Sequence, residues 1–265
     1  HGPTRITRSS YAEPHLVARM AEANAEDWPA LEAAAGRPLR RPCPTFFFGP
    51  AGGPIGAYAA AVAAAGAGRP GLAIDAVAPA RARAAAGGWL RIDDGDVVLH
   101  DHTGAVIDAA GCLRALADLV RAAGVAVYDG VAVTAIGGAA HAGPDAVSGG
   151  ASAGRRADGP VTVETAAGPL LAERVVVTAG AWIGRLLPVL AGRLTPLRQT
   201  VAMLDVPGDP TTAPNWVRVG GAGEPDVFGQ PALGHAGLKA AIHRQSGPPA
   251  PADDPDVAVP FDAAA

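Results

Sequence analysis

The chain has 265 residues, of which 49% are hydrophobic and 17% are charged, and its formal net charge is −4. This length is enough for one large domain or two ordinary ones, and the charge gives no reason to expect nucleic-acid binding. No run of about 18 apolar residues is free of Gly, Pro or charge, so we expect no transmembrane helix. Cys43 and Cys112 stand far apart, without the spacing of a metal motif. These features predict a soluble, cytoplasmic α/β protein with reduced thiols.

In chain order, the first half of the sequence predicts helices and short strands in alternation. The expected elements are a helix over 11–36, a strand at Thr45–Phe48, an Ala-rich helix at Pro54–Ala67, a strand at Leu72–Ile74 and a strand pair within Asp96–Ile107. The strand pair would turn at Thr103-Gly104. Asp108 fits the N-cap of a following helix, because its carboxylate can accept a hydrogen bond from an unpaired N–H group. Gly124 would end that helix.

The second half predicts more strands than helices. The expected elements are strands at Val125–Tyr128 and Val131–Ile136, a surface loop over 137–160, a hairpin of Val161–Glu164 with Leu170–Leu171, a buried strand at Val175–Thr178 and a helix from Ala179 to about Leu190. An antiparallel sheet is expected from Gln199–Val206, Trp216–Val219, Val227–Phe228 and Leu238–His243. An α/β layer that is interrupted, and then followed, by sheet-rich segments predicts two interleaved domains.

Residues Gly49–Gly56 form a glycine-rich segment between a predicted strand and a predicted helix. With Asp75 after the next strand, they supply the parts of a dinucleotide site, in which glycines admit a pyrophosphate and the acid binds a ribose. The spacing departs from G-x-G-x-x-G, since Ala51 stands where the first glycine belongs and Pro54 lacks an N–H group. The alternative is an ordinary strand–turn–helix.

Five short stretches carry a family resemblance. They are His1-Gly2-Pro3-Thr4-Arg5-Ile6-Thr7-Arg8 followed by Tyr11, Phe48-Gly49-Pro50, Thr178-Ala179-Gly180-Ala181-Trp182, Arg198-Gln199, and Gly237-Leu238-Lys239 with His243. The first is similar to the H-G-x-T-R-x-x-R stretch of the monomeric sarcosine oxidase family, a group of D-amino-acid-oxidase-like, FAD-dependent amine oxidases. The other four follow in the family's order at compatible spacings, so the resemblance covers almost the whole chain. It places Gly49–Gly56 in the substrate domain, away from the cofactor.

The resemblance implies a mixed α/β fold of two interleaved domains. Residues 1–41 and 98–196 would form a flavin domain built on a parallel sheet. Residues 42–97 and 197–265 would form a substrate domain with a mixed, mostly antiparallel sheet. The family's first βαβ unit, with its G-x-G-x-x-G, and its C-terminal part have no counterpart in the sequence, so we expect a chain truncated at both ends. Neither cysteine should inherit the flavin link of sarcosine oxidase.

The resemblance also implies roles for five residues. Arg8 would bind the substrate carboxylate through its guanidinium fork, and His1 and Arg5 would lie beside the FAD. Lys239 would bond through water to flavin N5 and promote the reaction of reduced flavin with oxygen, which is an electrostatic role. His243 would lie in the substrate pocket, on the same strand face as Lys239.

Taken without the resemblance, these residues have ordinary interpretations. The two arginines can be solvated, Lys239 can be an exposed residue of an alternating strand, and His243 can be a hydrogen-bonded structural residue. Phe228 stands where sarcosine oxidase has a tyrosine, and the missing hydroxyl argues against sarcosine itself as the substrate.

The resemblance therefore implies that the full-length protein is an FAD-dependent oxidoreductase that oxidises a secondary amine, or an N-methyl or other N-substituted amino acid, to an imine, and it leaves open whether the truncated chain is itself an enzyme. Oxygen would be the acceptor and hydrogen peroxide the product. Two alternatives stay open, a flavin-dependent amino-acid dehydrogenase with another acceptor and a non-catalytic fragment unable to bind flavin. The expected partner is a small-molecule amine or amino acid, with no nucleic acid, membrane or metal.

Overall fold

The fold is that of a computed structural model, and it describes residues 3–11, 16–66, 73–137, 159–197 and 199–243. These residues fall into two compact units, one comprising those up to Val125 together with Gln199–His243, and the other those from Ala126 to Leu197. The units are defined by contacts alone, so the assignment of the chain to flavin and substrate domains stays a prediction. No described helix combines the length and apolar composition needed to span a bilayer.

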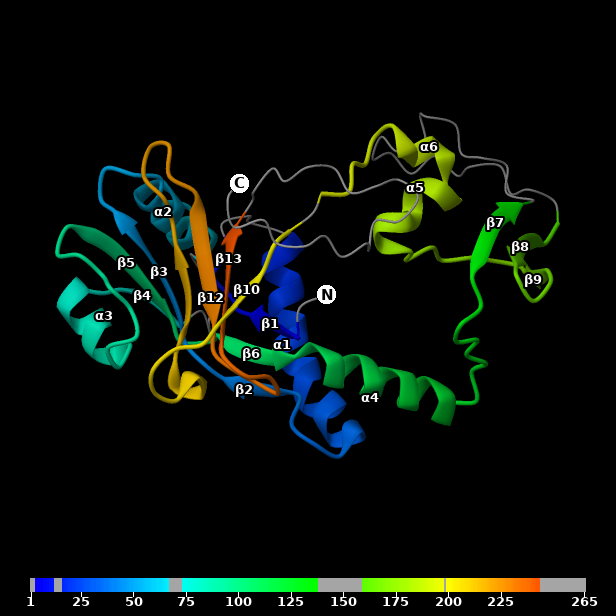
Figure 1. The fold of residues 1–265 in the computed structure, drawn as a ribbon, viewed down its shortest axis with the longest axis horizontal. Helices are drawn as coiled ribbons and strands as arrows, with labels where there is room; N and C mark the ends of the chain where they lie inside the picture. Colours follow the sequence, from blue (N-terminus) through cyan, green and yellow to red (C-terminus); the bar gives the residue numbers. More distant parts are fainter. Residues whose placement is uncertain (1–2, 12–15, 67–72, 138–158, 198, 244–265) are drawn as a thin grey trace. The chain divides into compact units, whose positions relative to one another are not determined.

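The first unit is built on a seven-stranded mixed sheet (Figure 1). Its strands, in spatial order, are β10 (Ala202–Leu204), β13 (Leu238–His243), β12 (Asp226–Gln230), β11 (Asn215–Arg218), β3 (Thr45–Pro50), β5 (Asp96–Asp101) and β4 (Ile74–Ala76). Neighbouring strands are antiparallel except β11 and β3, which pair in parallel with Asn215 beside Thr45. The prediction of a mixed, mostly antiparallel sheet is confirmed, and so is the antiparallel pairing of the four segments predicted between residues 199 and 243.

The remaining elements of this unit are four helices, a short 3-10 turn and a small antiparallel sheet. They are α1 (Leu16–Ala35), α2 (Ile55–Gly66), α3 (Pro79–Ala85), α4 (Ala109–Ala122), η3 (Pro210–Thr212), and a three-stranded sheet of β1 (Thr4–Thr7), β6 (Ala105–Asp108) and β2 (Arg40–Pro42) in the order β1-β6-β2. The helices predicted over 11–36 and Pro54–Ala67 are confirmed as α1 and α2, within the described residues.

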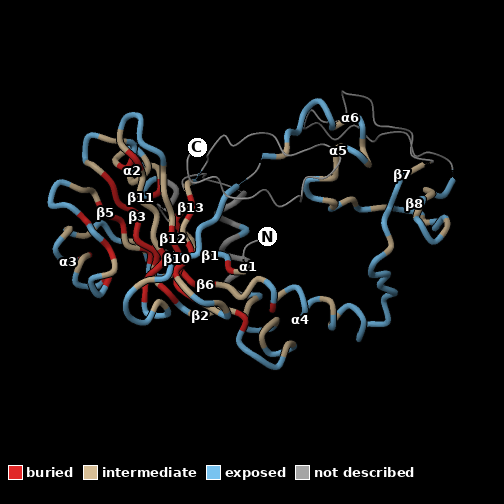
Figure 2. The backbone as a smooth tube through the Cα atoms, viewed as in Figure 1, coloured by how far each residue is buried: buried red, intermediate tan, exposed pale blue. Residues whose placement is uncertain are grey.

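The core of this unit lies on both faces of the large sheet, because side chains alternate along a strand. On one face, Phe47 and Leu99 are buried with Ile55 of α2. On the opposite face, Phe46 and Phe48 are buried against α3. Figure 2 shows the buried residues concentrated along the strands of the seven-stranded sheet. Two consecutive phenylalanines therefore serve two separate apolar layers.

The predicted strand pair within Asp96–Ile107 is wrong in its pairing. Both strands form, as β5 and β6, but β5 joins the seven-stranded sheet and β6 joins the small one. The chain passes between the sheets at Gly104, where a Cβ atom would lie 2.5 Å from Thr45 Oγ1 and 2.6 Å from the Cys43 carbonyl oxygen. Only glycine leaves room for this close approach.

Asp108 caps α4 as predicted. Its carboxylate accepts a hydrogen bond from the Gly111 N–H at 2.8 Å and lies 3.3 Å from the Arg37 guanidinium. Gly124, just beyond the helix, has φ of 76°, the left-handed conformation that glycine adopts at helix C-termini.

Replacing Asp108 by Ala is expected to lower the free energy of unfolding by about 1 kcal/mol, because the Gly111 N–H loses its acceptor. Urea denaturation followed by circular dichroism would measure this loss. Asp118→Ala on the same helix is the matched control, since Asp118 is 79% exposed and lies 3.7 Å from Arg121. It should change the stability by less than about 0.5 kcal/mol, and equal losses in the two variants would contradict the capping role.

The second unit contains an antiparallel meander followed by short helices. Its elements are β7 (Val133–Gly137), β8 (Val161–Thr165), β9 (Leu170–Ala172), η2 (Gly180–Trp182), α5 (Ile183–Leu186) and α6 (Pro188–Ala191). The predicted hairpin is confirmed as β8 and β9. The predicted helix after Ala179 is divided at Leu187, because Pro188 disfavours helical backbone in the residue before it.

Two predicted strands of this region are wrong. Val125–Tyr128 and Val175–Val177 form no ladder, and Val176 is 86% exposed. An apolar run needs a neighbouring strand to satisfy its backbone groups, and none of the described strands pairs with either segment. The parallel flavin-type sheet predicted from the resemblance is therefore not formed by the described residues. Most of the loop predicted over 137–160 lies outside the described residues.

Candidate active site

One face of the seven-stranded sheet gathers most of the residues to which the sequence assigned chemistry. A row of register partners crosses this face from β3 through β11 and β12 to β13: Phe47, Val217, Phe228 and Ala241. Residues two positions apart on a strand share a face. Lys239 and His243 therefore flank the row on β13, as the sequence predicted.

Lys239 is buried, with 3% of its surface exposed. Its Nζ donates to the Thr4 carbonyl oxygen at 2.9 Å and to Gln230 Oε1 at 3.3 Å, and the Thr4 hydroxyl donates to the same amide oxygen at 2.7 Å. An ammonium group has three donors, so these two bonds leave one N–H without a partner among the described residues. The interpretation of Lys239 as an exposed strand residue is therefore wrong.

The environment of Lys239 changes its proton affinity. Burial, and then the nearby Arg5 guanidinium, lower the pKa of Lys239 from 10.5 to about 8. Arg5 Nη1 donates at 2.9 Å to the Thr4 carbonyl oxygen, the same atom that accepts from Lys239. Two cations thus share one backbone acceptor, and a lysine that changes charge near neutral pH is typical of functional sites.

His243 lies on the exposed end of β13, so it is not buried with Lys239. Its Nδ1 is 3.9 Å from Asp226 Oδ2, and its ring meets Phe228 edge to face at 6.1 Å between centroids. Lys239 Nζ lies 6.0 Å from the centroid of the same Phe228 ring. Phe228 therefore links the two residues predicted to be catalytic. His1 lies outside the described residues.

Arg8 follows β1 and lies over the same sheet face, between two aromatic rings. Its guanidinium carbon is 4.2 Å from the centroid of Tyr11 and 4.9 Å from that of Phe47. Nη1 donates to the Tyr58 hydroxyl at 2.9 Å, to the Ser10 hydroxyl at 3.3 Å and to the Ser10 carbonyl. Nε and Nη2 donate to no described residue. This leaves an edge that can form two parallel hydrogen bonds with a carboxylate.

The cationic part of this site fits the edge of a flavin ring. The third Lys239 N–H and the Arg5 charge suit a polar, electron-rich ring edge.

The Gly49–Gly56 loop has a different geometry from a dinucleotide site, since β5 runs between β3 and β4 and is antiparallel to both, whereas such sites use adjacent parallel strands. Gly49 is required by packing, because a Cβ atom there would lie 2.2 Å from the Val219 carbonyl oxygen.

Three residues of this site, Thr4, Tyr58 and Gln230, were not predicted from the sequence. Gln230 follows Phe228 by two positions, so the strand period placed it on the same face. Tyr58 stands alone as a polar aromatic residue in an Ala-rich helix, which was its only signal. Thr4 lies within the first motif stretch, but its side chain carries no role in the resemblance.

Comparisons with known proteins give a family match and several similar structures. Residues 1–257 match the profile of the family described as FAD dependent oxidoreductase. Similar solved structures include NikD, an unusual amino acid oxidase essential for nikkomycin biosynthesis, in its open form, with 20% identity, a TM-score of 0.65, and coverage of 98% of this chain and 62% of that one. L-proline dehydrogenase from P. horikoshii has 14% identity, a TM-score of 0.66, and coverage of 89% and 57%.

Glycine oxidase from Geobacillus kaustophilus has 15% identity, a TM-score of 0.63, and coverage of 91% of this chain and 60% of that one. At such identities, these likenesses establish the fold alone. The chain spans 57–62% of the length of the three structures. A search of curated proteins gives no match.

Proposed function

The chain belongs to the FAD-dependent oxidoreductase family. We propose that it catalyses the oxidation of a secondary amine, or an N-methyl or other N-substituted amino acid, to an imine. Oxygen is the acceptor and hydrogen peroxide the product. The observation that carries this proposal is the open guanidinium edge of Arg8, held over the same sheet face as the buried ammonium of Lys239. FAD, when bound, supplies the oxidising power.

Arg8 binds the substrate carboxylate. Its position is set by the rings of Tyr11 and Phe47 and by the hydrogen bond to Tyr58, so little side-chain freedom is lost when a ligand binds. Phe47 and Phe228 are separated on the sheet face by one strand, β11. That separation is two interstrand spacings, about 10 Å, which suits a small amino-acid derivative.

Lys239 supplies a fixed positive charge beside the reacting atoms. The bonds to Thr4 and Gln230 hold the ammonium in place without neutralising it, and a preorganised charge in a buried site stabilises developing negative charge on oxygen. Arg5, which donates to the same Thr4 carbonyl, would lie on the cofactor side. His243 and the apolar ring of Phe228 form the wall of the substrate pocket.

Two alternatives have their own support. A dehydrogenase that passes electrons to an acceptor other than oxygen is favoured by the likeness to a protein named as a proline dehydrogenase. A non-catalytic chain is favoured by the described residues, which contain no adjacent parallel strands joined by a glycine turn and a helix.

The test is to incubate the purified chain with FAD, remove the excess, and record the visible spectrum before and after anaerobic addition of amines. We expect retained flavin absorbance that is bleached by N-methyl amino acids and much less by the same amines without a carboxylate. Admitting air should then give one peroxide per substrate. Bleaching without peroxide would favour the dehydrogenase, and a colourless protein would favour the non-catalytic chain.

A further inference from the structure

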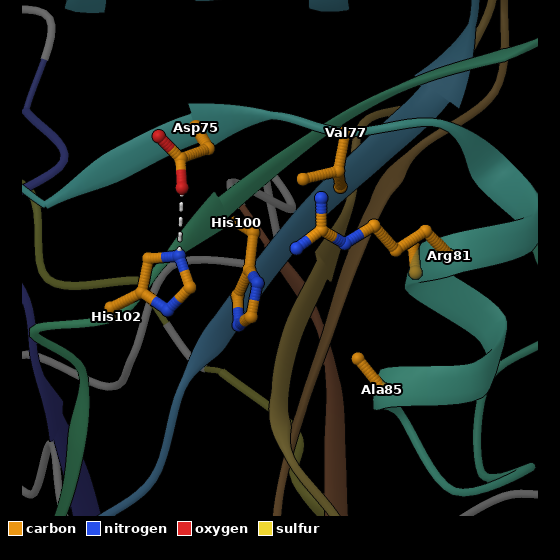
Figure 3. A pocket seen from close by; sticks show the side chains of 7 residues that line it. Asp75, Val77, Arg81, Ala85, His100 and His102 are labelled. Carbon is orange, nitrogen blue, oxygen red and sulfur yellow. Dashed lines mark hydrogen bonds and ion pairs between the residues drawn. The ribbon is translucent and has the colours of Figure 1, made fainter.

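A pocket of about 140 Å³ lies on the face of the sheet opposite to Arg8 and Lys239 (Figure 3). His100 of β5 pairs in register with Phe46, and Asp75 of β4 pairs with His100. All three therefore point to the face that α3 covers. Arg81 of α3 and His102, just after β5, complete the polar lining.

His100 lines this pocket with its imidazole ring. Its ring stacks on Phe46 at 4.3 Å and 15° and lies 3.9 Å from the His102 ring. Nε2 is buried and has no hydrogen-bond partner among the described residues. A proton there would be an unsatisfied buried donor, so the neutral ring favours the proton on Nδ1. Burial, and then the adjacent His102 ring, lower the pKa of His100, which keeps the ring neutral.

Arg81 is the cation of the pocket. Figure 3 shows its side chain extending from α3 toward His100. It forms no hydrogen bond or ion pair with a described residue, in contrast to Arg83 on the same helix, which lies 2.7 Å from Asp94 Oδ1 and donates to the Ile92 carbonyl oxygen.

Asp75 carries the only acidic side chain of the pocket lining, and His102 lies against it. His102 Nε2 is 3.0 Å from Asp75 Oδ2, and Figure 3 shows this contact at the far side of His100 from Arg81. The guanidinium of Arg81 and the imidazole of His100 therefore have no hydrogen-bond or ion-pair partner among the described residues.

We propose that this pocket binds a small oxyanion, a carboxylate or phosphate group, between the Arg81 guanidinium and the His100 imidazole. The volume lies below the roughly 300–1,000 Å³ of pockets for drug-sized ligands, and guanidinium bonds to oxyanions are charge-assisted and bidentate. The described residues hold no group of three His, Cys, Asp or Glu side chains arranged to hold a metal ion. The site is on the other face from the candidate active site, so it is independent of the proposed function.

The experiment follows the histidine Cε1–H signals of the whole chain by NMR during titration with sodium phosphate and, separately, sodium acetate, with sodium chloride holding the ionic strength constant. We expect a saturable shift of the His100 signal with at least one anion and a higher pKa of His100 at saturation, because a bound anion favours the imidazolium. The arm that saturates identifies phosphate or carboxylate. The His100 signal is assigned through its contact with the Phe46 ring.

Matched variants give the second readout. Arg81→Gln should weaken binding at least about tenfold, since charge-assisted hydrogen bonds are lost, and Arg81→Lys should retain part of the affinity. Arg91→Gln is the control, because Arg91 is 93% exposed and outside the pocket, and it should bind like the parent. Shifts that never saturate, or equal affinity in the parent and Arg81→Gln, would overturn the proposal.

Discussion

Replacing Lys239 by Met is expected to slow the reaction of the reduced, FAD-loaded protein with oxygen by about a hundredfold or more. Anaerobic reduction of the flavin by substrate should change far less. The reason is that Lys239 places a buried ammonium, held by Thr4 and Gln230, beside the reacting atoms. Stopped-flow measurement of the two half-reactions separates the effects, and equal slowing of both would refute the role.

The pH dependence gives this prediction a second readout. The ammonium of Lys239 has a pKa of about 8 in the folded chain and an ordinary value of 10.5. The oxygen reaction of the parent protein should therefore slow as the pH rises through about 8, because the positive charge is lost. In the Met variant, the slow rate should lack this transition.

The free energy of unfolding should increase with pH, whereas the rate of the oxygen reaction decreases. It can be measured without flavin. Between pH 8 and 10.5 the unfolded chain holds a proton on Lys239 that the folded chain has lost. The free energy of unfolding of the parent, relative to that of the Lys239→Met variant, should therefore rise with pH across this window. Urea denaturation at both ends of the window tests it. A flat difference would show that Lys239 keeps its ordinary pKa, as an exposed lysine does.

Replacing Arg8 by Gln is expected to lower kcat/KM for carboxylate-bearing amines by about a hundredfold, since two charge-assisted hydrogen bonds are lost. Amines without a carboxylate should be oxidised nearly as before. Arg8→Lys keeps the charge without the fork and should fall between the two. Steady-state assays of both substrate types decide the matter, and an equal loss for both types would remove Arg8 from carboxylate binding.

Tyr58 is a positioning residue for Arg8, and the Tyr58→Phe variant can be compared with Arg8→Gln. Tyr58→Phe keeps the ring beside Phe47, at 5.3 Å between centroids, and removes the hydroxyl that accepts from Arg8 and donates to the Ser10 carbonyl at 2.6 Å. We expect KM for carboxylate-bearing amines to rise by about tenfold, because Arg8 loses one of the contacts that position it, with kcat nearly unchanged.

Local patterns were sufficient to predict the elements with a clear period or cap. The four segments between residues 199 and 243 were predicted as strands, and Asp108 was predicted as an N-cap. Both the strand period and the cap depend only on a few neighbouring residues. The partner of each strand was harder to predict from the sequence. β5 and β6 were predicted to pair because they are adjacent in sequence, whereas Gly104 packs against Thr45 and Cys43 and directs them into separate sheets.

The candidate site shows the same limit. Arg8 and Lys239 were predicted from short motifs, and their side chains lie over one sheet face. The residues that hold them, Tyr58 and Gln230, were missed. Their contacts join β1 and its following loop to α2 and β12, and no periodicity within either segment indicates such a remote partner. The apolar run Val175–Val177 was wrongly predicted as a buried strand. Its pattern shows that the residues are apolar, but it contains no information about whether a neighbouring strand exists.

The parallel pairing of β3 with β11 has a consequence for biosynthesis. Phe46 and its neighbours emerge from the ribosome early, yet the strand that closes one side of them begins only at Asn215. Until then, β3 has an open edge beside some of the most buried side chains of the finished protein, which is a template for intermolecular strand pairing. High contact order of this kind also slows folding. Nascent chains that stop before Asn215 should therefore depend on chaperones, and the completed sheet should form only after synthesis passes His243.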